Sequence, residues 1–451
     1  MITPGQDAVS RAGARPLTVA IVGSGPAGMH CAVQLLGEFA QIHIDVFEQR
    51  SVPYGLVRHG TAPDHVEGEM LAQRFEEITG DPRLRLLAGV KVGSDITRAE
   101  LTAHYDAVVW AVGASEPRHL GIPGEQLPGV CTADDFFGWY TGLAGAPQFS
   151  LAGVREVVVV GFGDVGQDVA RILLKPAQSF TATHMPPQVL AELAAHRVRR
   201  VSVLNRSGAA RLKLKPRVLR ELVSLPNVAV ELEPPQLGPL PDDVDRKTRD
   251  SVLALEEAAR HPTADPSGHL HIALSRRPVA ILGNERAEAV RVESTDARGD
   301  GSGVREYAAQ LVVTAVGDDV AHVPDLPWDP ATRTIPSRET RLIDDNGVVQ
   351  VGEYVTGWAA RGNVAGFGST RRDAAQVSAA LDGDHRGGLL GAPQPGPEHV
   401  DALLARRGVS PIGWEGWHRL TALEAVRGTE IGRPSARIVD PEEQDAVVRG
   451  S

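Results

Sequence analysis

The chain has 451 residues, of which 42% are hydrophobic, and its formal net charge is -11 at pH 7. This length exceeds what one hydrophobic core can hold, so two domains are expected, and the acidic balance argues against nucleic acid as the main partner. The two cysteines, Cys31 and Cys131, are too few for a CxxC dithiol, an iron-sulfur ligand set or a zinc site. We therefore expect a multidomain protein of the reducing cytosol that binds no metal through its own side chains.

Residues 1–16 are polar and lack an apolar run that could enter a membrane, and we expect them to form a flexible arm. A strand is predicted over residues 18–22, followed by a glycine-rich turn and a helix that ends near residue 36. A second strand, over residues 42–47, ends at Glu48, twenty residues after Gly28. A carboxylate in this place can accept hydrogen bonds from the ribose hydroxyls of a bound adenosine.

The glycine-rich turn has the spacing G-x-G-x-x-G, which lets backbone amides at a helix N-terminus approach a pyrophosphate. With the glutamate, it predicts a first dinucleotide site formed by Gly23, Gly25, Pro26, Ala27, Gly28 and Glu48. After a strand over residues 108–112, a turn-rich run over residues 120–129 is typical of a crossing between domains.

A second fingerprint of the same spacing, Gly161 to Gly166, follows a predicted strand over residues 156–160 and precedes a helix over 166–174. A further strand is predicted over residues 201–204. Two such fingerprints in context indicate two dinucleotides bound side by side, as when a flavin and a nicotinamide meet for hydride transfer.

The rest of the chain predicts a polar connection over residues 234–266 and strands over 269–275, 279–282 and 311–316. A strand over residues 348–351, the pair Gly357-Trp358 and a helix over 373–381 then return to the first domain. We expect an α/β fold of two Rossmann-like, three-layer dinucleotide-binding domains, one inserted into the other. The predicted boundaries are a flexible arm over residues 1–16, a first domain over 17–115 and 319–451, and an inserted domain over 116–318.

Several longer motifs occur in order along the chain: Pro53 to Arg58 with Ala62 to His65, Ile122 to Val130, Asp168 to Leu173, and Gly357-Trp358 with Arg361-Gly362. With these motifs, the chain from about Leu17 to Pro434 resembles the adrenodoxin reductase type of ferredoxin-NADP(+) reductase. The resemblance implies an FAD enzyme that takes hydride from NADPH and passes single electrons to a ferredoxin, which serves an oxygenase such as a cytochrome P450. An inserted-domain enzyme of this type can work as a monomer. The low cysteine count and the lack of an apolar secretory segment lead us to expect a cytoplasmic protein with no membrane partner.

The resemblance implies further site residues. Gly55, Leu56, Trp358 and the final glycine turn Ala365, Gly366 and Phe367 would lie against the flavin, and Gly161, Gly163, Asp164, Val165, Asn205 and Arg206 would bind NADP(H). His65 would pair with Glu221 near the flavin and the nicotinamide, where the pair orients the nicotinamide and tunes flavin protonation. The plain alternatives are that Trp358 is a core residue and that His65 and Glu221 are unrelated surface residues.

The coenzyme loop departs from the family pattern. The family usually has Gly-Arg-Arg-Gly, where this chain has Asn205-Arg206-Ser207-Gly208, so one of two arginines that bind the 2'-phosphate is missing. Losing one charge-assisted contact costs about 1.5 to 3 kcal/mol. No acidic residue stands here to bind a free 2'-hydroxyl, so NADPH is favoured over NADH, and relaxed selectivity between the two coenzymes is the alternative.

A basic segment follows, with Arg211, Lys213, Lys215, Arg217 and Arg220. It is interpreted in three ways: as a substitute phosphate ligand, as a docking surface for an acidic ferredoxin, or as a solvated face. The final turn also departs from the family, since Asn363-Val364-Ala365 replaces Pro-Thr-Gly.

Two other functions stay open at this point. One is an NADPH dehydrogenase that reduces quinones or other small acceptors. The other is a catalytically weakened flavoprotein that acts as a sensor. A dithiol-disulfide reductase is excluded, because the chain lacks the cysteine pair.

Overall fold

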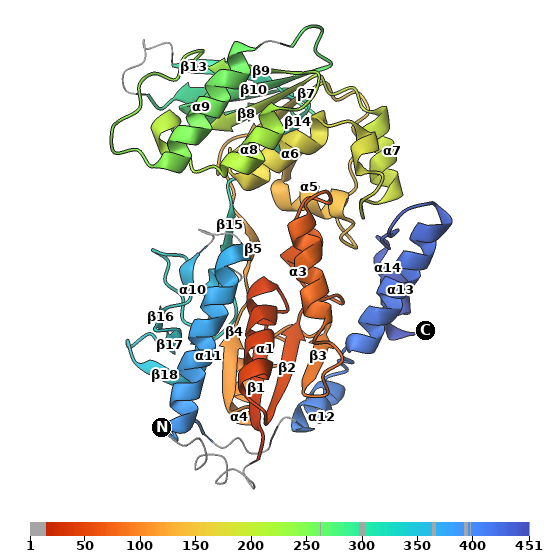
Figure 1. The fold of residues 1–451 in the computed structure, drawn as a ribbon, viewed down its shortest axis with the longest axis vertical. Coiled ribbons are helices and arrows are strands. Elements are labelled where there is room, and N and C mark those ends of the chain that lie inside the picture. The colour runs from red at the N-terminus through yellow and green to blue at the C-terminus, as the bar shows by residue number, and fades with distance from the viewer. Residues whose placement is uncertain are drawn as a thin grey trace, which may run out of the picture.

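The computed structural model describes residues 15–261, 263–296, 303–320, 322–362, 367–391, 396 and 398–450. These residues form two α/β domains, each built on its own largely parallel sheet and stacked along the long axis of the molecule (Figure 1). The α/β class and the insertion of one dinucleotide-type domain into another are as expected from the sequence.

The first domain contains a seven-stranded sheet in the order β16-β17-β18-β4-β1-β2-β3. Its strands are β1 (Leu17–Val22), β2 (Ile42–Glu48), β3 (Leu84–Ala88), β4 (Ala107–Trp110), β16 (Ser337–Arg338), β17 (Arg341–Ile343) and β18 (Val349–Val355). The strands β18, β4, β1, β2 and β3 are parallel, while β16 and β17 form an antiparallel edge. Every residue of β1 is buried, as expected for a central strand covered on both faces.

The second domain contains a six-stranded parallel sheet in the order β6-β14-β7-β8-β10-β9. Its strands are β6 (Val130–Thr132), β7 (Glu156–Val160), β8 (Arg200–Asn205), β9 (Val228–Glu233), β10 (Gly268–Leu274) and β14 (Leu311–Thr314). A separate antiparallel sheet consists of β11 (Arg276–Leu282), β12 (Ala289–Ser294) and β13 (Val304–Ala308).

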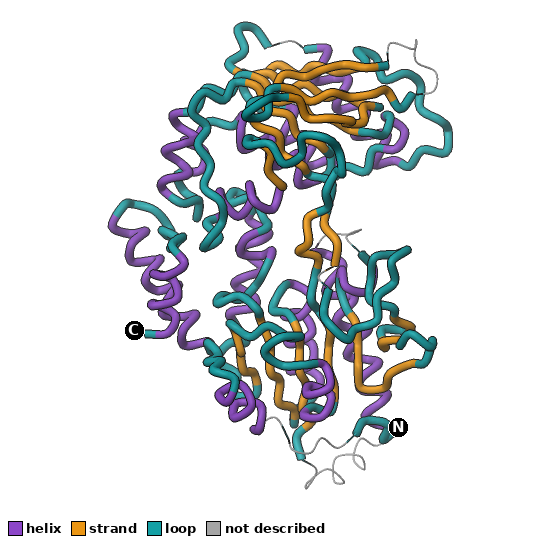
Figure 2. The backbone as a smooth tube through the Cα atoms, turned by 180° about the vertical axis from the view of Figure 1, so that it is seen from behind, coloured by secondary structure: helices purple, strands orange, loops and turns teal. Residues whose placement is uncertain are grey.

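The two domains are joined by an antiparallel pair of strands, β5 (Ala114–Pro117) and β15 (Asp318–Val320). Figure 2 shows this pair running between the two sheets. The chain thus passes from the first domain to the second and back at one place, and the predicted boundaries at 115/116 and 318/319 fall within these strands.

The helices cover the faces of both sheets. They are α1 (Pro26–Glu38), α2 (Leu56–His59), α3 (Val66–Glu76), α4 (Arg98–His104), α5 (Ala133–Thr141), α6 (Asp164–Leu174), α7 (Pro187–Ala195), α8 (Pro216–Val223), α9 (Arg246–Arg260), α10 (Trp358–Arg361), α11 (Thr370–Arg386), α12 (Glu398–Arg406), α13 (Trp414–Glu430) and α14 (Pro441–Arg449), with short 3₁₀ helices η1 (Ala177–Phe180), η2 (Ala209–Arg211) and η3 (Phe367–Ser369). Helices α1 and α11 pack together on one face of the first sheet (Figure 1). Cys31 of α1 is buried in that core.

One sequence expectation is wrong. The predicted polar connection over residues 234–266 contains α9. Its helix begins after Asp245, whose carboxylate accepts hydrogen bonds from the amides of Lys247 and Thr248. The helix buries only a narrow stripe that includes Val252 and Leu255, and most of its other residues are polar or charged. The periodic spacing of apolar residues that would predict a helix is therefore weak in the sequence.

Within the described part of the chain, no helix has both the length and the apolar character that a membrane crossing requires.

Candidate active site between two dinucleotide-binding domains

The first glycine turn is shaped by close backbone contacts. Gly23 has φ +107°, and a Cβ there would lie 2.4 Å from the carbonyl oxygen of Ala111, just after β4. A Cβ on Gly28 would lie 1.9 Å from the carbonyl oxygen of Gly23. A Cβ on Gly25 would meet nothing within 4 Å. The turn is therefore closed on the protein side and open at Gly25, where no side chain caps the first amides of α1.

The second glycine turn is built in the same way. A Cβ on Gly161, which has φ +118°, would lie 2.2 Å from the carbonyl oxygen of Ala315, just after β14. A Cβ on Gly166 would lie 2.0 Å from the carbonyl oxygen of Gly161, whereas Gly163 again faces open space. Both turns present uncapped helix amides to an open space, as the pyrophosphate of a dinucleotide requires.

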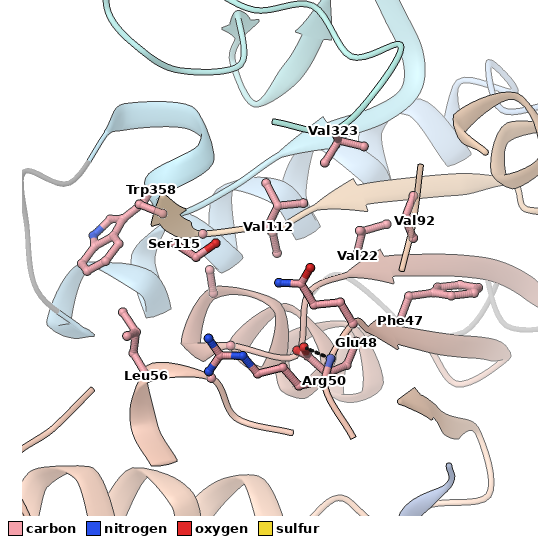
Figure 3. A pocket seen from close by; sticks show the side chains of 18 of the residues that line it. Val22, Phe47, Glu48, Arg50, Leu56, Val92, Val112, Ser115, Val323 and Trp358 are labelled. Atoms are coloured by element: carbon pink, nitrogen blue, oxygen red, sulfur yellow. Dashed lines mark hydrogen bonds between the residues drawn. The ribbon is translucent and has the colours of Figure 1, made fainter. Parts of the chain in front are cut away.

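A partly open pocket lies beside the first turn (Figure 3). Among the residues that line it are Gly23, Gly25, Pro26, Ala27, Glu48, Gly55, Leu56 and Trp358, all predicted from the sequence. Gly28 lies behind the turn, where it packs against Gly23. The predicted residues Ala365 and Gly366 and the side chain of Phe367 lie outside the described residues.

Glu48 is fixed at the wall of this pocket. The residue is 8% exposed. Its Oε2 accepts hydrogen bonds from the amide (3.2 Å) and the hydroxyl (2.6 Å) of Ser24, and its Oε1 accepts one from the amide of Arg50 (2.9 Å). A carboxylate offers about four lone-pair sites, so Glu48 retains capacity to accept a further hydrogen bond from a ligand hydroxyl.

Leu56 and Trp358 mark one end of the pocket, while Phe47 and Val92 lie toward the other (Figure 3). Leu56 begins α2 and Trp358 begins α10, after the last strand of the sheet. The indole is half-buried and forms part of the wall, so Trp358 is more than a core residue. The pocket thus has a polar part at Glu48 and an apolar end suited to a flat ring.

A cluster of charged side chains lies where α6 of the second domain meets the turn before α3 of the first. The side chain of Arg171 is 3% exposed. It donates two hydrogen bonds to Asp64, one of them 2.9 Å long, and two to Oδ1 of Asp168, at 2.9 and 3.2 Å. Lys175 adds a hydrogen bond of 2.7 Å to Asp64. The domains are therefore joined by a buried ionic network.

His65 and Glu221 belong to the same cluster. The distance from His65 Nε2 to Glu221 Oε2 is 3.8 Å, which is an ion-pair contact and too long for a hydrogen bond. The same Nε2 lies 3.5 Å from Asp168 Oδ1 and 3.1 Å from Arg171 Nη2. Both N–H groups of Arg171 Nη2 already donate to Asp64 and Asp168. The imidazole of His65 therefore faces two carboxylates and one guanidinium at the same ring nitrogen.

The carboxyl groups of this cluster differ in acidity. Burial raises the pKa of Asp64, but the hydrogen bonds and charges of Arg171 and Lys175 outweigh it and lower the pKa to about 2. For Asp168, burial dominates and raises the pKa, against the opposing charges of His65 and Arg171. Asp64 is thus a fixed negative charge, while Asp168 holds a proton more readily.

The loop after β8 contains the predicted coenzyme residues. The side-chain amide of Asn205 donates a hydrogen bond of 2.8 Å to the carbonyl of Ser207, which closes the turn. Arg206, Arg211 and Lys213 are exposed, and none of them forms an ion pair with a carboxylate in the described part of the chain. These three cations are available to an anionic ligand.

Two further cations of the basic segment form ion pairs. Lys215 Nζ lies 2.5 Å from Asp164 Oδ2 in the second glycine turn. Arg217 pairs with Glu67 of α3 and lies 3.5 Å from Glu221. The segment is therefore not a uniform solvated face.

The sequence is similar to known proteins over almost its whole length. Residues 17–208 match the family model for pyridine nucleotide-disulphide oxidoreductases. The chain is 34% identical over 455 residues to the mitochondrial NADPH:adrenodoxin oxidoreductase of Mus musculus. The aligned region covers 94% of this chain and 90% of that protein. The chain belongs to the adrenodoxin reductase family of ferredoxin-NADP(+) reductases.

Other members of the family are bacterial. The chain is 34% identical over 441 residues to a probable ferredoxin/ferredoxin-NADP reductase of Mycobacterium tuberculosis, covering 94% of this chain and 74% of that protein. The solved structure of Mycobacterium tuberculosis FprA in complex with NADPH superimposes with a TM-score of 0.86 at 31% identity, over 97% of this chain and 100% of the other. The resemblance stated from the motifs is thereby confirmed.

The residues of this family member fit the two dinucleotides. The open space at Gly25 and the carboxylate of Glu48 suit FAD, and the open space at Gly163 with the exposed Arg206 suits a phosphorylated nicotinamide coenzyme. Asp164 fits less simply, because a carboxylate at the start of α6 stands where phosphates would approach. The described residues contain no group of side chains that could hold a metal ion.

The sequence predicts no individual role for Asp64, Asp168, Arg171 or Lys175, which form the centre of the interdomain cluster. Asp64, Asp168 and Arg171 stand out in the sequence only as parts of the family motifs. The spacing of three residues between Asp168 and Arg171 on a predicted helix was a signal that they face the same side. The contact with Asp64 depends on the docking of two domains and has no local signature.

Proposed function

We propose that this chain is an FAD-dependent ferredoxin-NADP(+) reductase that takes hydride from NADPH and passes single electrons to a ferredoxin, in support of an oxygenase such as a cytochrome P450. The observation that carries the proposal is the pair of glycine turns of identical build, one per domain, with the ionic cluster of His65 between the domains. The relatives named for NADPH and adrenodoxin, or for ferredoxin, support it over the whole chain.

When bound, FAD supplies the redox chemistry, because a flavin can accept a hydride and release electrons one at a time. The chain holds it with the amides that start α1 at Gly25 and with Glu48, which accepts hydrogen bonds from the ribose hydroxyls. Leu56 and Trp358 cover the ring end of the pocket and exclude water. Positioning of this kind supplies a large part of the rate in a reaction that needs no covalent step with the protein.

The second domain holds NADPH through Gly161, Gly163 and Val165 of its glycine turn and through Asn205 and Arg206 after β8. Arg206 binds the 2'-phosphate as a charged donor. His65 and Glu221 form a pair that orients the nicotinamide, and Asp168 lies beside the same imidazole nitrogen.

The preference for NADPH rests on charge. Arg206, Arg211 and Lys213 have no carboxylate partner among the described residues, and the turn from Asn205 to Gly208 contains no acidic side chain that would bind a free 2'-hydroxyl. In this proposal the enzyme works as a monomer in the cytosol, and size-exclusion chromatography with light scattering tests the monomeric state.

The proposal is tested with the yellow, FAD-loaded protein under anaerobic conditions. NADPH and, separately, NADH are added while the flavin absorbance is followed, and a ferredoxin with cytochrome c is then supplied. We expect rapid bleaching with NADPH, slower bleaching with NADH, and cytochrome reduction only when ferredoxin is present. Bleaching without ferredoxin-dependent reduction would indicate an NADPH dehydrogenase for small acceptors, and absence of bleaching would indicate a sensor.

A further inference from the structure

The two glycine turns differ in the residue that starts the following helix. Pro26 begins α1, whereas Asp164 begins α6. An acidic residue in the first turn of a helix stabilises the helix itself. In the proposed function, however, the same amides receive the coenzyme's pyrophosphate, and a carboxylate beside them repels that anion. The second site therefore needs a compensating positive charge that the first does not.

Lys215 provides a positive charge at this place. Its Nζ lies 2.5 Å from Asp164 Oδ2, and the two side chains are 59% and 39% exposed, so the pair lies at a solvent-accessible edge of the turn. Lys215 is the residue immediately before α8, which Pro216 begins. The ammonium thus reaches the glycine turn from a different element.

The neighbouring cations form no ion pair with Asp164 among the described residues. Arg217 pairs with Glu67 on α3 of the first domain, and the exposed Arg206 and Arg211 follow the carboxyl end of β8. In the described part of the basic segment, Lys215 is the residue that the contacts place at the start of α6.

We propose that Lys215 is a positioning residue for the pyrophosphate of the nicotinamide coenzyme and that it acts by offsetting the charge of Asp164. The inference rests on the proposed function and assigns one residue of the basic segment to coenzyme binding. Because NADPH and NADH share the pyrophosphate, Lys215 contributes equally to the affinity for both. Arg206, by contrast, contributes only to the affinity for the phosphorylated coenzyme.

The test measures binding without turnover. The dissociation constants of NADP(+) and NAD(+) are determined by calorimetry for the FAD-loaded wild type and for Lys215→Met, Lys215→Arg, Asp164→Asn and the double variant Asp164→Asn/Lys215→Met. We expect Lys215→Met to raise the dissociation constants of both coenzymes by about tenfold, equivalent to about 1.4 kcal/mol of binding free energy. Lys215→Arg should bind within about threefold of the wild type, since the charge is kept. The double variant should bind within about threefold of Asp164→Asn, because no carboxylate is left to offset.

Arg291→Met is the matched control, because Arg291 is exposed on β12 of the separate antiparallel sheet, where it pairs with Glu306. Its affinities should equal those of the wild type. Flavin content and thermal unfolding show that each variant is folded.

The inference is overturned if Lys215→Met leaves both dissociation constants unchanged, if it weakens NADP(+) alone, or if it costs as much affinity in the Asp164→Asn background as in the wild type. Failure of the proposed function would show differently, as a wild-type protein that binds neither coenzyme or whose flavin NADPH does not reduce.

Discussion

Replacing Arg171 by methionine should destabilise the protein far more than removing a surface arginine. The side chain is 3% exposed and bridges Asp64 of the first domain to Asp168 of the second. Methionine keeps much of the side-chain volume but removes the charge and all the donors. The substitution therefore leaves two buried carboxyl groups without their main partner.

The expected loss of unfolding free energy depends on which partners remain for each of the two carboxyl groups. Removing one partner of a buried ion pair costs about 3 to 5 kcal/mol. Asp64 keeps the hydrogen bond of 2.7 Å from Lys175, so the larger loss falls on Asp168, whose nearest remaining charge is His65 at 3.5 Å. Asp168 can take up a proton, because burial already raises its pKa. We therefore expect a loss near the lower limit, about 3 kcal/mol.

The loss should also depend on pH. Without Arg171, the pKa of Asp168 in the folded protein lies further above its value in the unfolded chain. The folded state then binds more protons than the unfolded state in the interval between the two pKa values, so stability falls as the pH rises. The deficit of the variant should be larger at about pH 8 than at about pH 5.

The assay is urea unfolding of the FAD-loaded protein, followed by flavin fluorescence and circular dichroism. Arg291→Met is the matched control, since Arg291 makes hydrogen bonds of 2.8 and 2.9 Å to Glu306 on the surface of the same domain. An exposed pair contributes about 0 to 1 kcal/mol. The double variant Arg171→Met/Asp168→Asn should recover part of the loss. The reasoning is refuted if Arg171→Met loses no more than Arg291→Met, or if the second substitution recovers nothing.

Other changes give distinct outcomes. Glu221→Gln removes a charge 3.8 Å from His65 and should slow the reduction of the flavin by NADPH by about two- to fivefold, measured by stopped flow. An unchanged rate would contradict the proposed role of the pair. Arg206→Ala should raise the dissociation constant of NADP(+) by about ten- to hundredfold and leave that of NAD(+) unchanged; equal losses for both would contradict a 2'-phosphate contact. Burial and the charge of Asp134 raise the pKa of Asp318 to about 7, so its ionisation lowers stability as the pH rises toward that value. Asp318→Asn should therefore raise the melting temperature by about 2 to 4 °C at about pH 8 and by clearly less at about pH 5, where only part of the interval between the two pKa values has been crossed; a pH-independent effect would argue against this cause.

The sequence predicted best the features that backbone geometry imposes. The two fingerprints require glycine at Gly23 and Gly161, where φ is positive and a Cβ would collide with a neighbouring carbonyl. These constraints are local, so spacing alone located both turns, the strands before them and the carboxylate of Glu48. The strand limits differ by one to a few residues, because periodicity does not record the last ladder hydrogen bond.

Features that depend on long-range contacts or on weak patterns were missed. Helix α9 has mostly polar and charged residues and follows a proline-rich segment, so its sequence resembles that of a loop. Asp245 was nevertheless a usable signal for the start of a helix. The network of Arg171 joins residues from two domains, and no spacing in the chain predicts that meeting. The pair His65 and Glu221 was found only through the family resemblance, and the structure shows that Asp168 lies as close to the imidazole.

The strand pair β5 and β15 bears on the design of chimeras in which the inserted domain comes from another member of the family. Pro117 and Asp318 are partners in one ladder, and the amide of Arg118 donates a hydrogen bond of 3.1 Å to the carbonyl of Gly317. The first and last residues of the inserted segment therefore lie next to each other in space. A graft that replaces residues 118–317 needs two junctions at a single location and leaves every strand of the flavin-side sheet in place. Such a graft carries the loop after β8 as one unit, provided that its own side chains match Asp64, His65 and Glu67 of the first domain.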